Sequence, residues 1–251
     1  MQAFPGLYLV FLPLLFSCSG EVAPTTSTQL KPVEVPVFKK QNVSSSRRSK
    51  AVVTRVAPML VKDLQAQSLS YGSPVFIRIF KEERELEVWL RARDRFQLFR
   101  TYSIAAMSGK LGPKLQEGDG QAPEGFYFVP PSHMNPKSRF HLSFNLGYPN
   151  TYDRAHGRTG SALMVHGGQA SVGCFAMTDP KVEEIYTLAE AALRNGQRFF
   201  RVHSFPFRMI DQVRPRDLTT IVDSVVVIAN SELNRRTKKR ILAAMKTVGK
   251  I

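Results

Sequence analysis

Residues 163–179, with the sequence LMVHGGQASVGCFAMTD, restrict the possible folds of this chain more than any other stretch. An apolar run ends at His166, glycines follow it, and a Ser-x-Gly-Cys turn brings the chain to Cys174. Asp179 and Pro180 then open a helical pattern. The stretch predicts a strand, a tight turn and a helix in immediate succession, with an imidazole and a thiol close together.

The remainder of the domain is predicted to consist mainly of short strands. Runs of β-branched and aromatic residues predict strands over residues 75–80, 86–90, 96–105, 126–129, 141–145 and 198–203. A charged turn joins the first two runs into a predicted hairpin. Helices are expected over residues 57–69 and from Asp179, as N-cap, to a stop at Asn195-Gly196. Many short strands with one main helix after Cys174 predict an α+β, mainly β domain.

The N-terminus indicates export. An apolar run over residues 7–16 is too short for a comfortable membrane span and is interrupted by Pro13. Small residues around Cys18 follow it, as at an export cleavage site, and they also resemble a bacterial lipoprotein signal with Cys18 as the acylated residue. The alternative is a buried N-terminal strand or helix. We expect an exported protein of the periplasm or cell envelope, anchored to the membrane if Cys18 is acylated.

Composition suggests how the chain is divided. We expect a signal peptide over residues 1–17, a flexible linker rich in Pro, Ser, Thr and Lys over 18–55, and a catalytic domain over 56–207. A basic C-terminal extension is expected over 208–251. Within it, residues 219–229 are apolar and ambiguous between helix and strand, and residues 231–250 form a predicted basic helix.

The charge of the chain indicates a polyanionic partner. Thirty-five Lys and Arg against 20 Asp and Glu give a net charge of +15. The chain has no recognisable nucleic-acid motif, and an export signal would remove it from nucleic acid, so we expect no nucleic-acid partner. Anionic wall polymers or a membrane surface satisfy the same electrostatics. The full sequence contains two cysteines, Cys18 and Cys174. If Cys18 is lipidated or removed, Cys174 is the single free thiol of the mature protein.

The pairing of His166 and Cys174 predicts thiol catalysis. A free cysteine has a pKa near ~8.5, so an imidazole that takes its proton is needed to form a thiolate–imidazolium pair at neutral pH. Gly173 permits the sharp turn, backbone N–H groups around Cys174 can hold an oxyanion, and Ser171 can orient the imidazole or the substrate.

Three other interpretations of these residues were weighed. Cys174 and His166 can be inert core residues. A zinc site can draw on the upstream histidines, but no carboxylate or second cysteine completes a ligand spacing, so no metal is expected. Ser171 as nucleophile lacks the Gly-x-Ser-x-Gly frame. The upstream histidines are His133, His141 and His156.

The sequence resembles the L,D-transpeptidase catalytic domain of the YkuD type. The hallmark of that family, His-Gly and then Ser-x-Gly-Cys, is present as His166-Gly167 and Ser171–Cys174. The resemblance extends over about residues 75–206. Segments 109–115 and 121–127 resemble the region that precedes the site in this family, and segments 135–153 and 157–160 resemble its YafK-like branch.

The resemblance implies a β-rich fold, peptidoglycan stem peptides as substrate and an acyl-enzyme on Cys174 with His166 as general base, without a cofactor. It also implies supporting roles for Gly167, Ser171 and Gly173. Contacts to substrate are expected from Asn145, Tyr148 and Arg158.

The acceptor of the acyl group is left open by the sequence. An amine acceptor makes the protein a transpeptidase, whereas water makes it a hydrolase, either an L,D-carboxypeptidase or an amidase that releases a wall-linked lipoprotein. A non-catalytic wall-binding module is the third alternative.

Overall fold

The computed structural model describes residues 40–208. These residues belong to one compact unit that begins at Phe38, and the expected signal peptide, Cys18 and residues 209–251 lie outside the described part. Among residues 40–208, no helix is long and apolar enough to cross a membrane.

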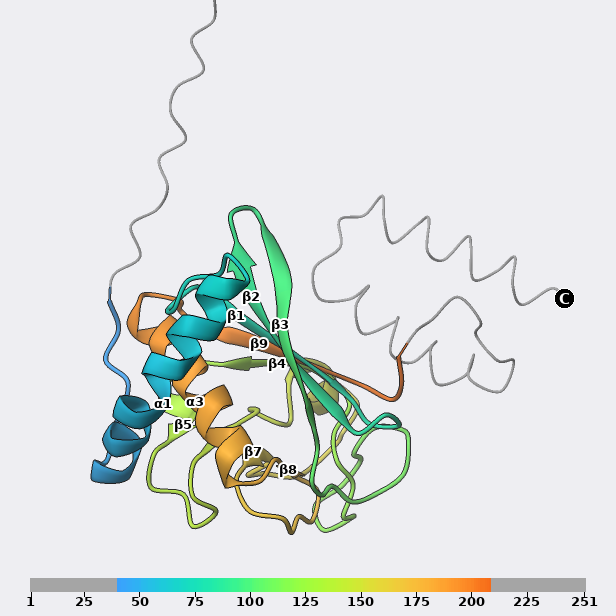
Figure 1. The fold of residues 1–251 in the computed structure, drawn as a ribbon. Helices are drawn as coiled ribbons and strands as arrows, with labels where there is room; N and C mark the ends of the chain where they lie inside the picture. The colour runs from blue at the N-terminus through green and yellow to red at the C-terminus, as the bar shows by residue number, and fades with distance from the viewer. Residues whose placement is uncertain (1–39, 209–251) are drawn as a thin grey trace, which may run out of the picture. The chain divides into compact units, whose positions relative to one another are not determined.

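Two sheets and two longer helices make up the described fold (Figure 1). The first sheet has the strand order β3-β2-β1-β9-β4 and the second has the order β5-β6-β7-β8. This arrangement confirms the expected α+β, mainly β class. The elements in chain order are α1 (Arg47–Ala66), β1 (Val75–Phe80), β2 (Glu85–Ala92), β3 (Arg95–Ser103), β4 (Gly125–Val129), η1 (Pro131–His133), β5 (Met134–Asn135), β6 (Ser143–Asn145), α2 (Thr151–Ala155), β7 (Met164–His166), β8 (Phe175–Ala176), α3 (Asp179–Arg194) and β9 (Phe200–Phe205).

The five-stranded sheet is organised around β1. The expected hairpin is confirmed, because β1 and β2 pair antiparallel from Val75↔Leu90 to Phe80↔Glu85. On its other side β1 pairs parallel with β9, which returns from α3. Alternate residues of β1, such as Ile77 and Ile79, are fully buried in the core, as the period of two in a strand requires.

Helix α1 begins well before the expected start at residue 57, so residues 47–55 were wrongly included in the linker. Ser46 caps it: its side chain accepts a hydrogen bond from the Ser49 N–H, and its own backbone N–H donates to Ser49 Oγ. Buried apolar side chains then recur every four residues and place one face of α1 against α3. The Ser, Arg and Lys residues around the cap resembled linker composition and hid this face. Those buried side chains are Val52, Val56, Leu60 and Leu64.

Helix α3 starts at Asp179, one residue earlier than expected. Thr178, with φ of 69°, is the N-cap and makes no side-chain cap bond, so the expectation of Asp179 as N-cap was wrong. Asp179 is the first helical residue, and its Oδ1 accepts a hydrogen bond of 2.8 Å from the Gly168 N–H. The carboxylate therefore connects the helix start to the loop after His166 instead of capping the helix. The predicted stop at Asn195-Gly196 is confirmed.

We expect Leu60→Ala in α1 to lower the free energy of unfolding by about 2–5 kcal/mol, because it removes buried methyl groups and leaves a cavity against α3. Leu60 is fully buried, whereas Met59, its neighbour on the same helix, is 48% exposed and provides the matched control as Met59→Ala. Urea unfolding followed by circular dichroism measures both. Equal urea midpoints for the two variants would contradict a stabilising contact between α1 and α3.

Candidate active site

The second sheet brings the two predicted catalytic residues onto neighbouring strands. β7 ends at His166 and pairs parallel with β8, with Val165 opposite Phe175 and His166 opposite Ala176. Cys174 directly precedes β8 and therefore lies beside Met164, whose N–H donates to Cys174 Sγ at 3.4 Å. Because alternate residues of a strand share a face, Met164 and His166 point the same way. The thiol thus lies next to the strand that carries the imidazole.

The imidazole of His166 is held in one tautomer. Its Nδ1 lies 2.6 Å from the carbonyl oxygen of Gly167, and a carbonyl can only accept, so Nδ1 carries the hydrogen. Nε2 then has a free lone pair, as a general base requires. Burial lowers the pKa of His166, with the Gly167 carbonyl acting in the opposite direction, so the ring is neutral near pH 7.

Gly167 has no room for a side chain. A Cβ at this position would lie 2.5 Å from Asp179 Oδ1 and 2.9 Å from the carbonyl oxygen of Phe140. The close approach allows Gly168 to bind Asp179 and allows the Phe140 ring to pack 4.7 Å from the His166 ring centroid. Only glycine therefore fits at position 167, where a supporting role was predicted.

The thiol of Cys174 is half-buried. Its Sγ accepts from Met164 N–H and lies 3.7 Å from the carbonyl oxygen of Ala162, to which the thiol donates. Burial raises the pKa of Cys174, while the Met164 N–H and the ammonium of Lys114 act to lower it. Both pKa directions favour a neutral thiol beside a neutral imidazole, rather than the ion pair that the sequence suggested for the resting site.

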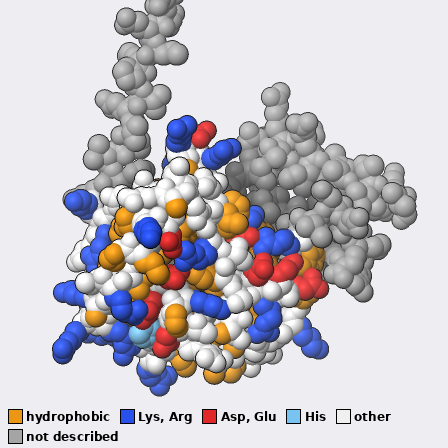
Figure 2. Space-filling model, viewed as in Figure 1, with side chains coloured by type: hydrophobic (Ala, Val, Ile, Leu, Met, Phe, Trp, Pro, Cys, Tyr) orange, Lys and Arg blue, Asp and Glu red, His pale blue; other side chains and the backbone are white. Residues whose placement is uncertain are grey.

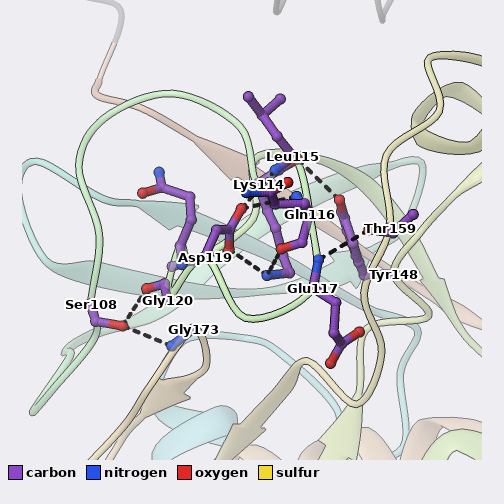
Figure 3. Close-up of polar contacts among 12 residues, drawn as sticks. Ser108, Lys114, Leu115, Gln116, Glu117, Asp119, Gly120, Tyr148, Thr159 and Gly173 are labelled. Carbon is purple, nitrogen blue, oxygen red and sulfur yellow. Dashed lines mark hydrogen bonds and ion pairs between the residues drawn. The ribbon is translucent and has the colours of Figure 1, made fainter.

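The two backbone amides expected to hold an oxyanion have acceptors within the protein. The Gly173 N–H donates to Ser108 Oγ at 2.8 Å, and the Cys174 N–H donates to Ser171 Oγ at 3.1 Å. Figure 3 shows Ser108 joining Gly173 to the carbonyl of Gly120. Sequence reasoning missed Ser108, because nothing in the loop that contains it distinguishes this serine as a contact of the Cys174 turn.

The loop over residues 108–121 carries a buried cation, Lys114, whose charge acts on the Cys174 thiol. Figure 3 shows the polar contacts of this loop. Lys114 is 4% exposed, and its ammonium donates to Asp119 Oδ1 at 2.5 Å and to the Gln116 carbonyl oxygen at 2.8 Å. Burial would raise the pKa of Asp119, but Lys114 and the loop N–H groups hold it well below its ordinary value. Lys114 was also missed from the sequence, since a lysine in a charged loop is ordinarily solvated.

A second buried lysine attaches this loop to the first sheet. Lys81, at the end of β1, is 2% exposed and donates to Glu124 Oε1 at 2.9 Å. It also donates to three loop carbonyls, which fixes the path of the chain before β4. Those carbonyls belong to Lys110, Gly112 and Ala122.

Each of the three residues predicted to contact substrate makes at least one hydrogen bond within the protein, and Arg158 also has a buried Nε without a partner. Asn145 Oδ1 accepts from the Gly147 N–H at 2.8 Å, and Tyr148 OH donates to the Lys114 carbonyl at 3.0 Å. Arg158 donates to Asp153 Oδ1 at 2.9 Å. Tyr148 thereby supports the loop that carries Lys114 (Figure 3), and substrate contact by these three residues stays a prediction.

The three upstream histidines contact three different groups. His133 Nδ1 lies 3.2 Å from the Asn145 carbonyl, His141 Nε2 lies 2.8 Å from Glu183, and His156 Nδ1 lies 2.9 Å from the Tyr152 carbonyl. Within residues 40–208, no group of three His, Cys, Asp or Glu side chains could hold a metal ion.

A hollow of about 600 Å³ lies elsewhere in the described part. It lies beside α3, and its lining includes Tyr71, Thr187, Glu190 and Arg194. Its lining holds no thiol and no imidazole, so the candidate nucleophile and base are found on the second sheet instead.

The site has the residue pair found in one class of proteins, the thiol enzymes: a histidine at the end of β7 and a cysteine immediately before β8. The sequence profile described as the L,D-transpeptidase catalytic domain, YkuD, matches residues 74–227, which is more than half of the chain. The chain belongs to this family, as the resemblance implied. The match extends past residue 207, where we expected the catalytic domain to end.

Two curated relatives support the predicted branch. The chain is 47% identical over 140 residues to the protein named "Putative L,D-transpeptidase YafK" of Escherichia coli K12, and equally to that of Escherichia coli O157:H7. The aligned region covers 56% of this chain and 57% of each relative, so the chain spans little more than half of their length.

Two solved structures are similar over part of the chain. One is the helical cell shape determining protein Pgp2 of Campylobacter jejuni, with 18% identity, a TM-score of 0.43, and coverage of 68% of this chain and 59% of Pgp2. The other is Bd1075 of Bdellovibrio bacteriovorus, with 24% identity, a TM-score of 0.41, and coverage of 60% and 56%.

We expect Lys114→Gln to raise the pKa of Cys174 further, because it removes the cation that favours the thiolate. The pH at which alkylation by iodoacetamide reaches half its maximal rate, followed by mass spectrometry on Cys174, measures this change. Below that pH the thiol is protonated and reacts slowly, so the variant should react more slowly than the parent at pH 8.

Lys110→Gln is the matched control, since Lys110 is an exposed lysine in the same loop. An alkylation profile of Lys114→Gln that coincides with those of the parent and Lys110→Gln would contradict the influence of Lys114 on the thiol.

Proposed function

We propose that this chain is an exported, peptidoglycan-modifying cysteine enzyme that transfers an acyl group of a stem peptide through Cys174. The observation that carries the proposal is the hydrogen bond of His166 Nδ1 to the Gly167 carbonyl, which leaves Nε2 to act as base on the strand beside the thiol, in a chain of the L,D-transpeptidase catalytic-domain family. Envelope localisation follows from the N-terminal sequence and is part of the proposal.

The neutral resting pair determines the order of proton transfer. As Sγ of Cys174 attacks the substrate carbonyl, Nε2 of His166 takes the thiol proton, so that charge separation occurs only as the S–C bond forms. The imidazolium then donates that proton to the leaving amine when the C–N bond breaks, which leaves a thioester. An acceptor amine attacks the thioester with Nε2 as base again, and Cys174 recovers its proton.

The hydroxyl of Ser171 is suited to stabilise the oxyanion. Its Oγ accepts from the Cys174 N–H, so its own hydrogen remains to be donated to a developing negative charge. The Gly173 N–H becomes a second donor when the substrate oxygen replaces Ser108 Oγ. Both serines thereby provide acceptors for these amides until substrate arrives.

The positive charge of the chain suits an anionic envelope surface. Lys and Arg side chains are spread over the face seen in Figure 2 instead of gathering in one patch, and the full chain carries a net charge of +15. A spread positive potential attracts a polyanion without defining one orientation, as expected for contact with wall polymer or an anionic membrane.

We expect Cys174→Ala to abolish turnover of peptidoglycan fragments, and His166→Gln to lower kcat by about 10²–10⁴-fold, the range for loss of a general base. His156→Gln is the matched control, because His156 is exposed and contacts only its own helix, at the Tyr152 carbonyl. Circular dichroism confirms that each variant is folded.

The full chain is incubated with purified muropeptides and a free D-amino acid, and the products are identified by mass spectrometry. Cross-linked or D-amino-acid-exchanged stems identify the transpeptidase, whereas shortened stems or released amines identify the hydrolase alternative. Absence of any Cys174-dependent product, with all variants folded, would refute the catalytic proposal in favour of a wall-binding module.

A further inference from the structure

The five-stranded sheet has a second apolar face that does not belong to the hydrophobic core. Inward residues of its strands, such as Ile77 and Val88, are part of the core cluster, whereas the alternate side chains point to the opposite side. We call these alternate side chains the aromatic face. Its principal members are Phe76, Trp89, Phe96, Leu98, Phe126 and Phe128.

The aromatic face is continuous across the sheet. Phe76 on β1 packs against Phe96 of β3 at 5.7 Å between ring centroids and against His203 of β9 at 4.7 Å. His203 in turn packs against Phe126 of β4 at 4.5 Å. The strand register also aligns Trp89 with Phe76. The face is therefore one surface and not a scatter of separate side chains.

This surface exposes several large apolar side chains, and the guanidinium groups of Arg78 and Arg201 lie over the rings of Trp89 and Phe128. Phe96, Leu98 and Phe128 are 40%, 38% and 44% exposed. A sheet with one solvated face normally alternates apolar and polar residues, and contiguous exposed apolar patches mark interaction sites. A layer that covers these side chains would complete the sheet as a two-sided structure.

The chain itself leaves the described part on this side of the sheet. The Arg208 N–H donates to Glu83 at 2.7 Å, and its guanidinium donates to Glu85 and Glu87 at 2.5 Å each. The same guanidinium lies 4.1 Å above the ring of Phe80. Glu87 also accepts from the indole N–H of Trp89 at 2.8 Å, which connects this anchor to the aromatic face.

The sequence after Arg208 supplies an apolar segment of sufficient reach. Residues 219–229, TTIVDSVVVIA, are mostly β-branched and apolar. The preceding ten residues can extend about 33 Å, and five strands at their usual spacing are about 20 Å across. The family match continues to residue 227, so residues 219–227 of the segment lie within the sequence that matches the catalytic domain.

We propose that residues 209–229 of this chain dock on the aromatic face and form its covering layer, with Arg208 as the anchor at the start of the segment. Tethering at Arg208 keeps the apolar segment at a high effective concentration beside the face, which favours an intramolecular partner over a second copy. The proposal concerns the side of the sheet away from the core and does not depend on the proposed catalytic activity.

Photo-cross-linking of the full chain tests the occupant of the face. The benzophenone amino acid is introduced at Phe128 on the face and, as control, at Met59, which is 48% exposed on α1. We expect the Phe128 probe to cross-link to peptides from residues 209–229 within one chain, and the Met59 probe to give no such products. Mixed isotope labelling distinguishes one chain from two. Cross-links between chains, or absence of cross-links to residues 209–229, would overturn the proposal.

Fluorescence provides a second measurement, because Trp89 is the single tryptophan of the chain and lies on the face. We expect Val226→Asp, in the apolar segment, to shift the emission of Trp89 to longer wavelength and to increase its quenching by acrylamide. Thr237→Asp, beyond the segment, is the matched control and should leave both unchanged. Identical emission and quenching in the two variants and the parent, with unchanged circular dichroism, would count against docking.

Discussion

The parallel pairing of β7 with β8 is the interaction on which the candidate site depends. It places Val165 opposite Phe175, both fully buried, and so fixes the strand that carries His166 beside the residue that follows Cys174. Parallel strands normally need a long crossover, but here the connection is the short glycine-containing turn of residues 167–174. Hydrogen bonds from Met177 N–H to the His166 carbonyl and from Thr178 N–H to the Gly168 carbonyl close this turn. Helix α3 then starts without a break, so the site and the helix are one local structure.

Burial gives the site its electrostatic character. It raises the pKa of Cys174 and lowers that of His166, and both shifts favour the uncharged forms. A protonated thiol is a weaker nucleophile than a thiolate, so a base that takes its proton favours attack. Lys114 acts against this tendency from a loop that is itself held by buried ion pairs. The pKa of Cys174 therefore depends both on the residues around its turn and on the loop of residues 108–121, which is distant in sequence.

The two faces of the first sheet differ: one packs into the core that supports the site, and the other carries exposed aromatic side chains. Its inward side chains and α1 and α3 provide the core against which the second sheet is built. Its outward side chains form the aromatic face, and the described chain ends there at a residue fixed by three glutamates. The presence of apolar residues on both faces explains why β1 (VFIRIF) has a nearly continuous apolar sequence, a pattern typical of strands covered on both sides.

The sequence by itself determined the features that are local along the chain. The hairpin of β1 and β2, the strand ending at His166, the turn at Gly173 and the helix after Cys174 all depend on residues within a few positions of one another, so periodicity and turn chemistry predict them. The family was also evident from the sequence, because its hallmark residues are contiguous.

The tertiary structure alone decided which groups meet across long sequence separations. Ser108 contacts Gly173, and Lys114 acts on Cys174, through a loop whose path is fixed by Lys81 and Glu124. No spacing rule connects such residues. The start of α1 at Arg47 was likewise decided by packing against α3, which overrode a composition typical of a linker. The protonation of the candidate pair, His166 and Cys174, depends on burial, and burial is a property of the assembled fold rather than of any segment.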